Sequence, residues 1–307
     1  MKHLIRDGVW VTMLTPFTAD NQVDYPALEA MVEWYAAAGV DGLFSVCQSS
    51  EMFFLTADER EKIGRFVVEK AAGRMQVVVS GHISDGIEDQ IAELRRAASC
   101  GADAVVLVSN RLAGPEESEE VWKQNAARIL EAVPDCDFGI YECPYPYKRL
   151  LSPSLLRWCA ETGRFSFLKD TSCDLAQIRE KLAAVKGTPL KLFNANSATL
   201  LPSLQAGASG FCGVMANFHP ELYVRLTHRW QQEPETAEIL QHFAAVASFI
   251  ERQDYPHNAK FHMSLCGLPV GMHCRVKPDT TWNLLFETET RELFSLWQDL
   301  KKTLPTD

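Results

Sequence analysis

The sequence alternates eight times between a short apolar run and a longer amphipathic stretch. The apolar runs are rich in Val, Ile and Phe and almost uninterrupted, which is typical of parallel strands buried on both faces. They comprise Val9–Leu14, Gly42–Val46, Gln76–Ser80, Ala104–Val108, Phe138–Tyr141, Phe165–Lys169, Leu190–Phe193 and Gly210–Val214. Eight strand–helix units within about 230 residues predict a (β/α)8 barrel. A doubly wound open sheet is the alternative, but no Gly-x-Gly-x-x-Gly motif follows the first run.

The stretches between these runs carry helix signals. Asp24–Ala38 has apolar residues at helical spacing and ends before a glycine, as amphipathic helices do. Thr56 and Glu59 have the spacing of a capping box. Ser152 followed by Pro153 is typical of a helix start. These signals place one helix after each of several strands.

The last part of the chain shows no strand alternation. It predicts three helices over Glu235–Glu251, His257–Leu265 and Thr281–Lys302. No Gly/Ser-rich linker or charge run separates this part from the rest. We therefore expect a barrel over residues 1–233 and a C-terminal helical extension, residues 234–307, packed on it.

Composition excludes several classes of function. The 30 Lys and Arg against 40 Asp and Glu give a net charge of −10, which disfavours nucleic acids and anionic membranes as partners. No apolar run approaches the ~20 residues that span a bilayer, and the charged N-terminus does not resemble a signal peptide. Nine cysteines without a Cys-x-x-Cys pair indicate reduced thiols, and hence a cytoplasmic protein.

Lys169 ends the sixth apolar run, at the side of the barrel where active sites form. Alternation places Phe165, Phe167 and Lys169 on one face of the strand. Burial of an ammonium group is costly, which favours the neutral amine, and a neutral amine can attack a ketone to form a Schiff base. The alternative is a lysine that reaches solvent or pairs with Asp170.

Tyr141 ends the fifth run and should neighbour Lys169, because adjacent strands lie about 4.8 Å apart. A phenol beside an amine can move protons during Schiff-base chemistry, although a core tyrosine with a satisfied hydroxyl is the alternative. The second run leads into Gln48, Ser49 and Ser50. Their hydroxyls and backbone N–H groups can bind a carboxylate, unless the loop only caps itself.

Other strand ends supply further candidates for substrate binding. Asn194 ends the seventh run, and Cys212 and Gly213 lie in the eighth. Arg111 follows the fourth run. Together with Lys148 and Arg149 it could hold a second acidic group of the substrate, with a surface charge as the alternative.

These segments together resemble the dihydrodipicolinate synthase / N-acetylneuraminate lyase family of pyruvate-handling class I aldolases. The resemblance spans nearly the whole chain and rests on Gly8–Phe17, Cys47–Glu51, Tyr141–Pro144, Leu168–Ser172 and Gly207–Gly210. It implies a (β/α)8 barrel with C-terminal helices, usually a homotetramer. It also implies a covalent Schiff base without a cofactor.

The resemblance gives roles to single residues. Lys169 matches the Schiff-base lysine, and Tyr141 matches the tyrosine of the family's Tyr-Asn-x-Pro motif. Ser49 takes the position whose hydroxyl holds the pyruvate carboxylate and links to that tyrosine. Gln48 and Ser50 replace a hydroxyl residue and a glycine, and an amide cannot exchange a proton as a hydroxyl does.

Other departures bear on the second substrate. Tyr145–Arg149 lacks the early arginine of dihydrodipicolinate synthases, and Ser109–Leu112 lacks their tyrosine. Asn194–Ser197 lacks the carboxylates that N-acetylneuraminate lyases use for sugar hydroxyls. The sequence therefore predicts a Schiff-base lyase or aldolase acting on pyruvate or a related 2-oxo acid, with an aldehyde as the second substrate whose identity stays open.

Two alternatives remain at this point. A metal-dependent hydrolase on the same fold would draw its ligands from His82, His219, His257, His262 and His273, although no HxH or HExxH motif is present. A non-catalytic family member that binds a 2-oxo acid is the other, because Gln48 departs from the motif.

Overall fold

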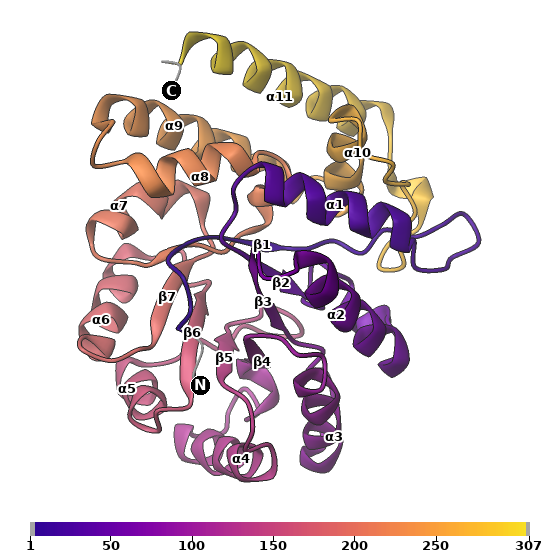
Figure 1. Cartoon of the computed structure of the whole chain (residues 1–307). Coiled ribbons are helices and arrows are strands. Elements are labelled where there is room, and N and C mark those ends of the chain that lie inside the picture. The colour runs from indigo at the N-terminus through magenta and orange to yellow at the C-terminus, as the bar shows by residue number, and fades with distance from the viewer. Residues whose placement is uncertain (1–3, 305–307) are drawn as a thin grey trace.

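The computed structural model describes residues 4–304 and shows a closed barrel of eight parallel strands in the order β1 to β8 (Figure 1). The strands are β1 Gly8–Thr12, β2 Gly42–Ser45, β3 Gln76–Val79, β4 Ala104–Val108, β5 Phe138–Tyr141, β6 Phe165–Asp170, β7 Lys191–Asn194 and β8 Gly210–Phe211. β1 pairs with both β2 and β8, which closes the barrel. The predicted (β/α)8 fold is confirmed.

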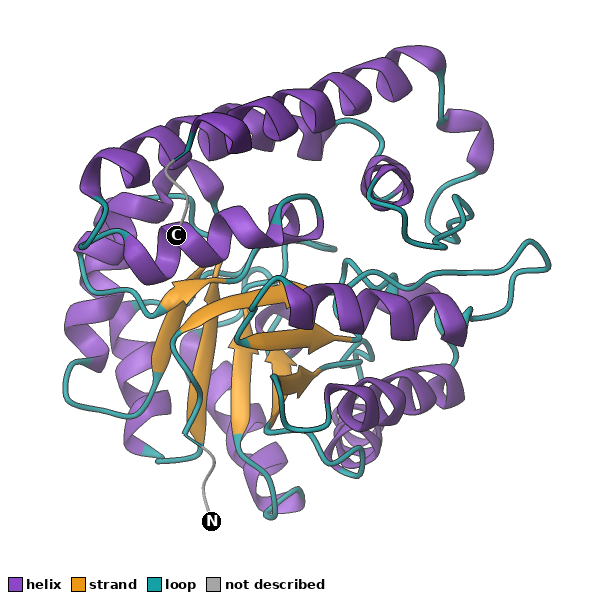
Figure 2. Ribbon diagram, turned by 45° about the horizontal axis from the view of Figure 1, so that its top comes forward, coloured by secondary structure: helices purple, strands orange, loops and turns teal. Residues whose placement is uncertain are grey.

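Helices surround the strands on the outside (Figure 2). They are α1 Tyr25–Ala37, α2 Ala57–Ala71, α3 Ile87–Ala98, α4 Glu119–Ala132, α5 Pro153–Glu161, α6 Leu175–Val185, α7 Leu200–Gln205 and α8 Pro220–Arg229. Short 3-10 helices lie at Met52–Phe54 (η1), Ser109–Arg111 (η2), Ser197–Thr199 (η3), Val214–Asn217 (η4), Ser248–Arg252 (η5) and Asp279–Thr281 (η6). The capping box of Thr56 and Glu59 is complete, and Ser152 caps α5 as expected.

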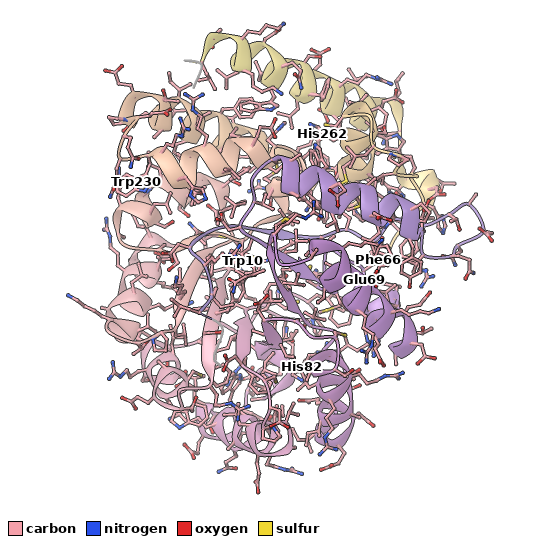
Figure 3. The ribbon with its side chains drawn as sticks, viewed as in Figure 1. Trp10, Phe66, Glu69, His82, Trp230 and His262 are labelled. Atoms are coloured by element: carbon pink, nitrogen blue, oxygen red, sulfur yellow. The ribbon has the colours of Figure 1, made fainter. Side chains whose placement is uncertain are left out.

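Aromatic side chains fill the barrel interior beneath the strand ends. The Trp10 side chain lies among the strands of the barrel (Figure 3). Its ring lies 5.3 Å from Phe167 and 5.7 Å from Phe193, measured between centroids, and Phe167 stacks on Phe193 at 4.8 Å. Gly42 makes room for this layer, because a Cβ there would lie 2.3 Å from the Trp10 ring. The packed aromatics form the floor of the space above them.

The C-terminal extension consists of α9 Pro234–Ala247, α10 His257–Leu265 and α11 Leu284–Thr303, which lie over one side of the barrel (Figure 1). Trp297 of α11 donates to Glu221 of α8 at 2.7 Å, and Gln241 of α9 accepts from the backbone N–H of Leu201 at 2.7 Å. The proposed division at residues 233 and 234 falls between α8 and α9.

Several predicted boundaries differ from the structure, two of them with a clear local cause. β8 ends at Phe211 rather than Val214, because the chain turns into η4 there. The helix expected to reach Glu251 ends at Ala247, and the chain continues as η5. The nine cysteines all carry free thiols, and within residues 4–304 no helix is long and apolar enough to cross a bilayer.

Candidate active site

A cavity of about 360 Å³ opens at the carboxyl ends of the strands. Residues from the barrel loops and from the C-terminal extension line it together. They are Gln48, Ser49, Glu51, Tyr141, Pro144, Lys148, Lys169, Thr171, Cys173, Ala195, Asn196, Gly213, Val214, Glu251, Tyr255, Pro256 and Val276.

Lys169 and Tyr141 lie side by side in this cavity. They are register partners on β6 and β5, as the sequence predicted, and Lys169 is only 4% exposed. Its Nζ lies 4.3 Å from the centroid of the Tyr141 ring and 5.8 Å from that of Phe44. Among the described residues, Nζ has no hydrogen-bond or ion-pair partner. The amine is therefore held by aromatic faces and left open toward the cavity.

The Tyr141 hydroxyl donates to Oε1 of Gln48 at 3.2 Å. The Cys143 thiol donates to the same oxygen at 3.3 Å. Burial raises the pKa of Tyr141 well above its usual value. The phenol is therefore neutral and oriented by an amide oxygen, which accepts a proton donor but does not relay its proton.

Ser49 lies on the cavity wall with a loosely held hydroxyl. Its Oγ is 3.4 Å from the hydroxyl of Thr12 on β1. The backbone N–H groups of Gln48 and Ser49 have no acceptor among the described residues, whereas those of Ser50 and Glu51 bond within the turn. Gln48 and Ser49, which both line the cavity, thus keep a loosely held hydroxyl and two N–H groups that have no acceptor in the described part of the chain.

Glu51 fixes this loop to the C-terminal part of the chain. Its carboxylate accepts the backbone N–H groups of Arg275 and Val276 at 2.6 and 2.8 Å and pairs with Lys260 at 3.1 Å. Val46 and Glu51 both have positive φ angles, of 53° and 59°. Positive φ angles are uncommon for residues other than glycine and are strained for a β-branched residue such as Val46. The bonds around Glu51 therefore hold the loop in a strained conformation.

Gly213 also lines the cavity. A Cβ at this position would lie 2.5 Å from the carbonyl oxygen of Ala195 and 2.3 Å from the Phe211 ring. A larger residue would therefore push into the wall, and the glycine keeps the backbone close to the cavity.

The structure does not bring the other predicted binding residues into the cavity lining. Ser50 is buried and donates to the carbonyl oxygen of Met13 at 2.7 Å. Asn194 donates to the hydroxyls of Thr199 and Ser203, both at 3.0 Å. Both side chains are buried, and their polar atoms fix neighbouring loops.

Arg111 and Cys212 likewise lie outside the cavity lining. Arg111 pairs with Asp85 at 2.6 Å and stacks on Phe53. Its charge is therefore engaged by a carboxylate that does not line the cavity. Cys212 is fully buried, and burial raises the pKa of its thiol to about 12. It is a core residue next to the site.

Sequence reasoning missed Glu251 and Tyr255. Both come from the C-terminal extension. The sequence pattern predicted a continuous helix up to Glu251 and a connecting segment before the next helix at His257. Burial raises the pKa of Glu251 to about 7, opposed by the charge of Lys169. The Tyr255 hydroxyl is buried and has no hydrogen-bond partner among the described residues. Apart from the loss of helical spacing near Pro256, the sequence carries no signal for either.

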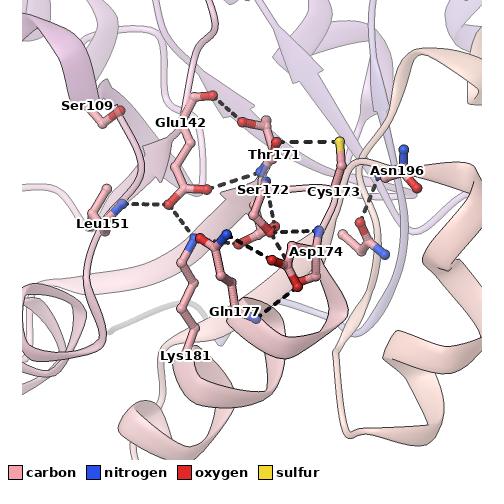
Figure 4. A network of polar contacts seen from close by, with 12 residues as sticks. Ser109, Glu142, Leu151, Thr171, Ser172, Cys173, Asp174, Gln177, Lys181 and Asn196 are labelled. Atoms are coloured by element: carbon pink, nitrogen blue, oxygen red, sulfur yellow. Dashed lines mark hydrogen bonds and ion pairs between the residues drawn. The ribbon is translucent and has the colours of Figure 1, made fainter. Parts of the chain in front are cut away.

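A buried ion triad lies on the other side of the same two strand ends. Nζ of Lys181 on α6 is 2.6 Å from Glu142 and 2.6 Å from Asp170. Glu142 also accepts the backbone N–H groups of Leu151 and Thr171 (Figure 4). Glu142 follows Tyr141 and Asp170 follows Lys169 in the chain, so the triad fixes both strand ends from behind.

The histidines of the metal alternative lie apart from the cavity lining. The His82 ring accepts from the backbone N–H of Val108 at 3.0 Å and bonds Gln90 at 2.9 Å. The other four, all near the C-terminal part of the chain, are His219, His257, His262 and His273. Within residues 4–304, no group of three or more His, Cys, Asp or Glu is arranged to hold a metal ion.

Fold and site together define a (β/α)8-barrel lyase with a buried lysine and a tyrosine at neighbouring strand ends. A family model described as the dihydrodipicolinate synthetase family matches residues 6–292. The chain belongs to this family. The resemblance found in the sequence is thereby confirmed.

Relatives with known names cover most of the chain. A 4-hydroxy-tetrahydrodipicolinate synthase of Gluconacetobacter diazotrophicus is 26% identical over 278 residues, covering 90% of this chain and 92% of the relative. The putative 2-dehydro-3-deoxy-D-gluconate aldolase YagE of Escherichia coli is 27% identical, covering 96% and 97%. The two names denote different activities, so family membership defines a lyase or aldolase and not one substrate.

Solved structures agree with this assignment. The crystal structure of YagE in complex with pyruvate superposes with a TM-score of 0.84 at 26% identity, covering 96% of this chain and 98% of that one. A monomeric dihydrodipicolinate synthase variant superposes with a TM-score of 0.86 at 20% identity, covering 96% and 98%, and shows the shared fold.

Proposed function

We propose that the protein is a lyase or aldolase that binds pyruvate or a related 2-oxo acid as a Schiff base on Lys169. The observation that carries the proposal is the buried Lys169 amine 4.3 Å from the Tyr141 ring, in a cavity at the strand ends. The relative YagE, whose structure contains pyruvate, supports the choice of a 2-oxo acid. No further cofactor is part of this proposal.

The reaction begins when the lone pair of the Lys169 amine adds to the ketone carbon. Tyr141 moves protons so that the former carbonyl oxygen leaves as water, which gives an iminium ion. Loss of a proton from the neighbouring carbon gives an enamine. This carbon attacks an aldehyde, whose oxygen takes up a proton, and water then hydrolyses the iminium to release product and amine. In reverse, the same steps cleave a longer 2-oxo acid.

Ser49 is placed to hold the carboxylate of the 2-oxo acid. Its hydroxyl and the free backbone N–H groups of Gln48 and Ser49 provide three donors on one side of the cavity. Donors fixed by a rigid loop bind an anion without reorganising. The carboxylate would thereby set the ketone carbon toward Lys169.

Trapping with borohydride tests the proposal. Incubation with pyruvate and borohydride, followed by peptide mass spectrometry, should place a reduced adduct on Lys169. The matched control is Lys169→Arg, which keeps a cation but cannot form the same imine. Absence of an adduct across a panel of 2-oxo acids would contradict the proposal.

A non-catalytic protein that binds 2-oxo acids is the second candidate. The observation in its favour is the hydrogen bond from Tyr141 to the amide of Gln48, which replaces a proton-exchanging hydroxyl. Thermal stabilisation by pyruvate without turnover of any aldehyde or long 2-oxo acid would favour this candidate.

We also propose a cytoplasmic homotetramer. Large apolar side chains are exposed on the C-terminal helices, and exposed apolar groups of this size often mark an interface. They are Ile239, Val246, Phe249, Leu284, Leu285 and Leu296. Light scattering should give four times the chain mass, and a monomer mass at micromolar concentration would contradict the assembly.

A further inference from the structure

Glu251 presents a carboxyl to the cavity that no other described residue binds. It lies on η5 of the C-terminal extension and shares the cavity wall with Lys169 and Tyr141. It makes no hydrogen bond or ion pair with any residue in the described part of the chain. A charged group that is mostly buried is normally paired, so an open carboxyl here needs an explanation from its use.

Most other polar groups on the wall are engaged within the protein. Nζ of Lys148 donates to the carbonyl oxygen of Thr171 at 2.6 Å. Glu51 pairs with Lys260. The Oε1 atom of Gln48 already accepts two donors. Glu51 and Gln48 support the wall through these bonds, whereas the bond of Lys148 occupies only one of the three N–H groups of its ammonium.

Tyr255 adds a second open group close to Glu251. It follows four residues later in the chain, lines the same cavity and has a buried hydroxyl without a partner. Burial raises the pKa of Tyr255 well above its usual value, against a smaller opposing effect of the nearby Ser49 hydroxyl, so the phenol stays a donor. Burial also raises the pKa of Glu251 to about 7, so near neutral pH its carboxyl can accept or donate.

These open groups suit one kind of second substrate. When the 2-oxo acid occupies Lys169 and Ser49, a carboxyl and a phenol are left for the rest of the reaction. Both bind hydroxyl groups well, and a carboxyl repels a second carboxylate. The guanidinium of Arg111, which could have attracted one, is paired with Asp85 outside the lining. The ammonium of Lys148 does line the cavity, and it is held by the carbonyl oxygen of Thr171.

We propose that Glu251, with Tyr255, binds the hydroxyl groups of the aldehyde half, so that the enzyme takes neutral hydroxyaldehydes and rejects aldehydes carrying a carboxylate. This inference rests on the proposed Schiff-base function. Glu251 then determines which aldehydes the enzyme accepts, whereas Lys169 and Tyr141 carry out the bond-making steps.

The experiment compares kcat/KM for pyruvate with three aldehydes: glyceraldehyde, propionaldehyde and succinic semialdehyde. Glu251→Ala should lower the value for glyceraldehyde about 10- to 100-fold, because its hydroxyls lose a partner, and that for propionaldehyde by less than about 3-fold. Glu251→Gln should raise the value for succinic semialdehyde relative to glyceraldehyde. Tyr255→Phe should act like Glu251→Ala but more weakly. Glu292→Gln, an exposed charge change on α11, is the control.

Three results would overturn the inference. One is an equal loss for all three aldehydes in a variant with an unchanged melting temperature. Another is a wild-type preference for succinic semialdehyde, and the third is pyruvate trapping on Lys169 with no turnover of glyceraldehyde. Borohydride trapping in every variant separates the two levels: with trapping intact, only the inference on Glu251 fails, whereas no trapping in the wild type removes the proposed function and the inference together.

Discussion

The ends of β5 and β6 carry two opposite kinds of polar region, back to back. On the cavity side, Lys169 and Tyr141 have open polar atoms or a single weak partner. On the helix side, the next residues in the chain, Glu142 and Asp170, bind Lys181 at 2.6 Å each. Both regions are buried. Strand alternation separates them by one residue, so one face supplies support and the other supplies chemistry.

The difference shows how a buried amine without an acid partner can persist. Lys181 satisfies its charge with two carboxylates, whereas Lys169 lies against aromatic faces. At these strand ends the unpaired polar groups face the cavity, where a ligand can use them, and the paired groups lie behind them. Substitutions on either side of these strand ends test this contrast.

Replacing the open lysine should have the largest effect, and only on activity. We expect Lys169→Met to lower kcat by at least about 10⁴-fold, because no nucleophile remains. Its free energy of unfolding, measured in urea, should be unchanged or higher, since no ion pair is lost. A destabilisation above about 2 kcal/mol would mean that Lys169 is a structural residue.

Replacing the paired lysine should do the reverse. Lys181→Met leaves Glu142 and Asp170 buried without a cation, so we expect a loss of about 3–5 kcal/mol in the free energy of unfolding. The triple variant that adds Glu142→Gln and Asp170→Asn should recover part of that loss. A cost below about 1 kcal/mol for Lys181→Met would show that the triad does not hold the strand ends.

The buried carboxyl of Glu251 should lower the free energy of unfolding as the pH rises. Burial raises the pKa of Glu251 from 4.5 to about 7, so in this window the folded protein keeps a proton that the unfolded chain has released. Its stabilising contribution is complete at low pH and is lost as the pH rises from 4.5 through 7.

Glu251→Gln should therefore stabilise the protein at pH 8 by about 1–2 kcal/mol, a value reduced for partial exposure, and by much less at pH 5. Urea denaturation of both proteins at the two pH values measures the difference. An equal difference at both pH values would show that ionisation of Glu251 has no part in it.

The fold was predictable because its signals are local and repeated. Each apolar run and each capping residue, such as Thr56, acts within one turn or strand, and eight repetitions leave few architectures. Lys169 and Tyr141 were predictable as neighbours for the same reason, since both end a strand and adjacent parallel strands place such residues together.

The rest of the site depends on long-range packing. Glu251 and Tyr255 reach the cavity only because the helix α9 stops at Ala247 and η5 turns inward. Ser50 and Arg111 were expected in the site but bond to groups elsewhere in the fold. Spacing along the chain shows which residues share a strand end, but not which of them already have partners.

The smallest expected effect concerns Gln48, whose amide oxygen accepts the Tyr141 hydroxyl but cannot relay its proton. A substitution here tests whether proton exchange at Tyr141 matters for activity. Gln48→Thr supplies a hydroxyl that can exchange protons, and we expect kcat to rise about 3- to 10-fold if proton transfer limits the rate. The rate of pyruvate trapping on Lys169 and kcat should increase together. A lower kcat with unchanged trapping would mean that the amide positions Tyr141 better than a shorter hydroxyl does, and the contrast between the two faces would then rest on geometry and not on proton exchange.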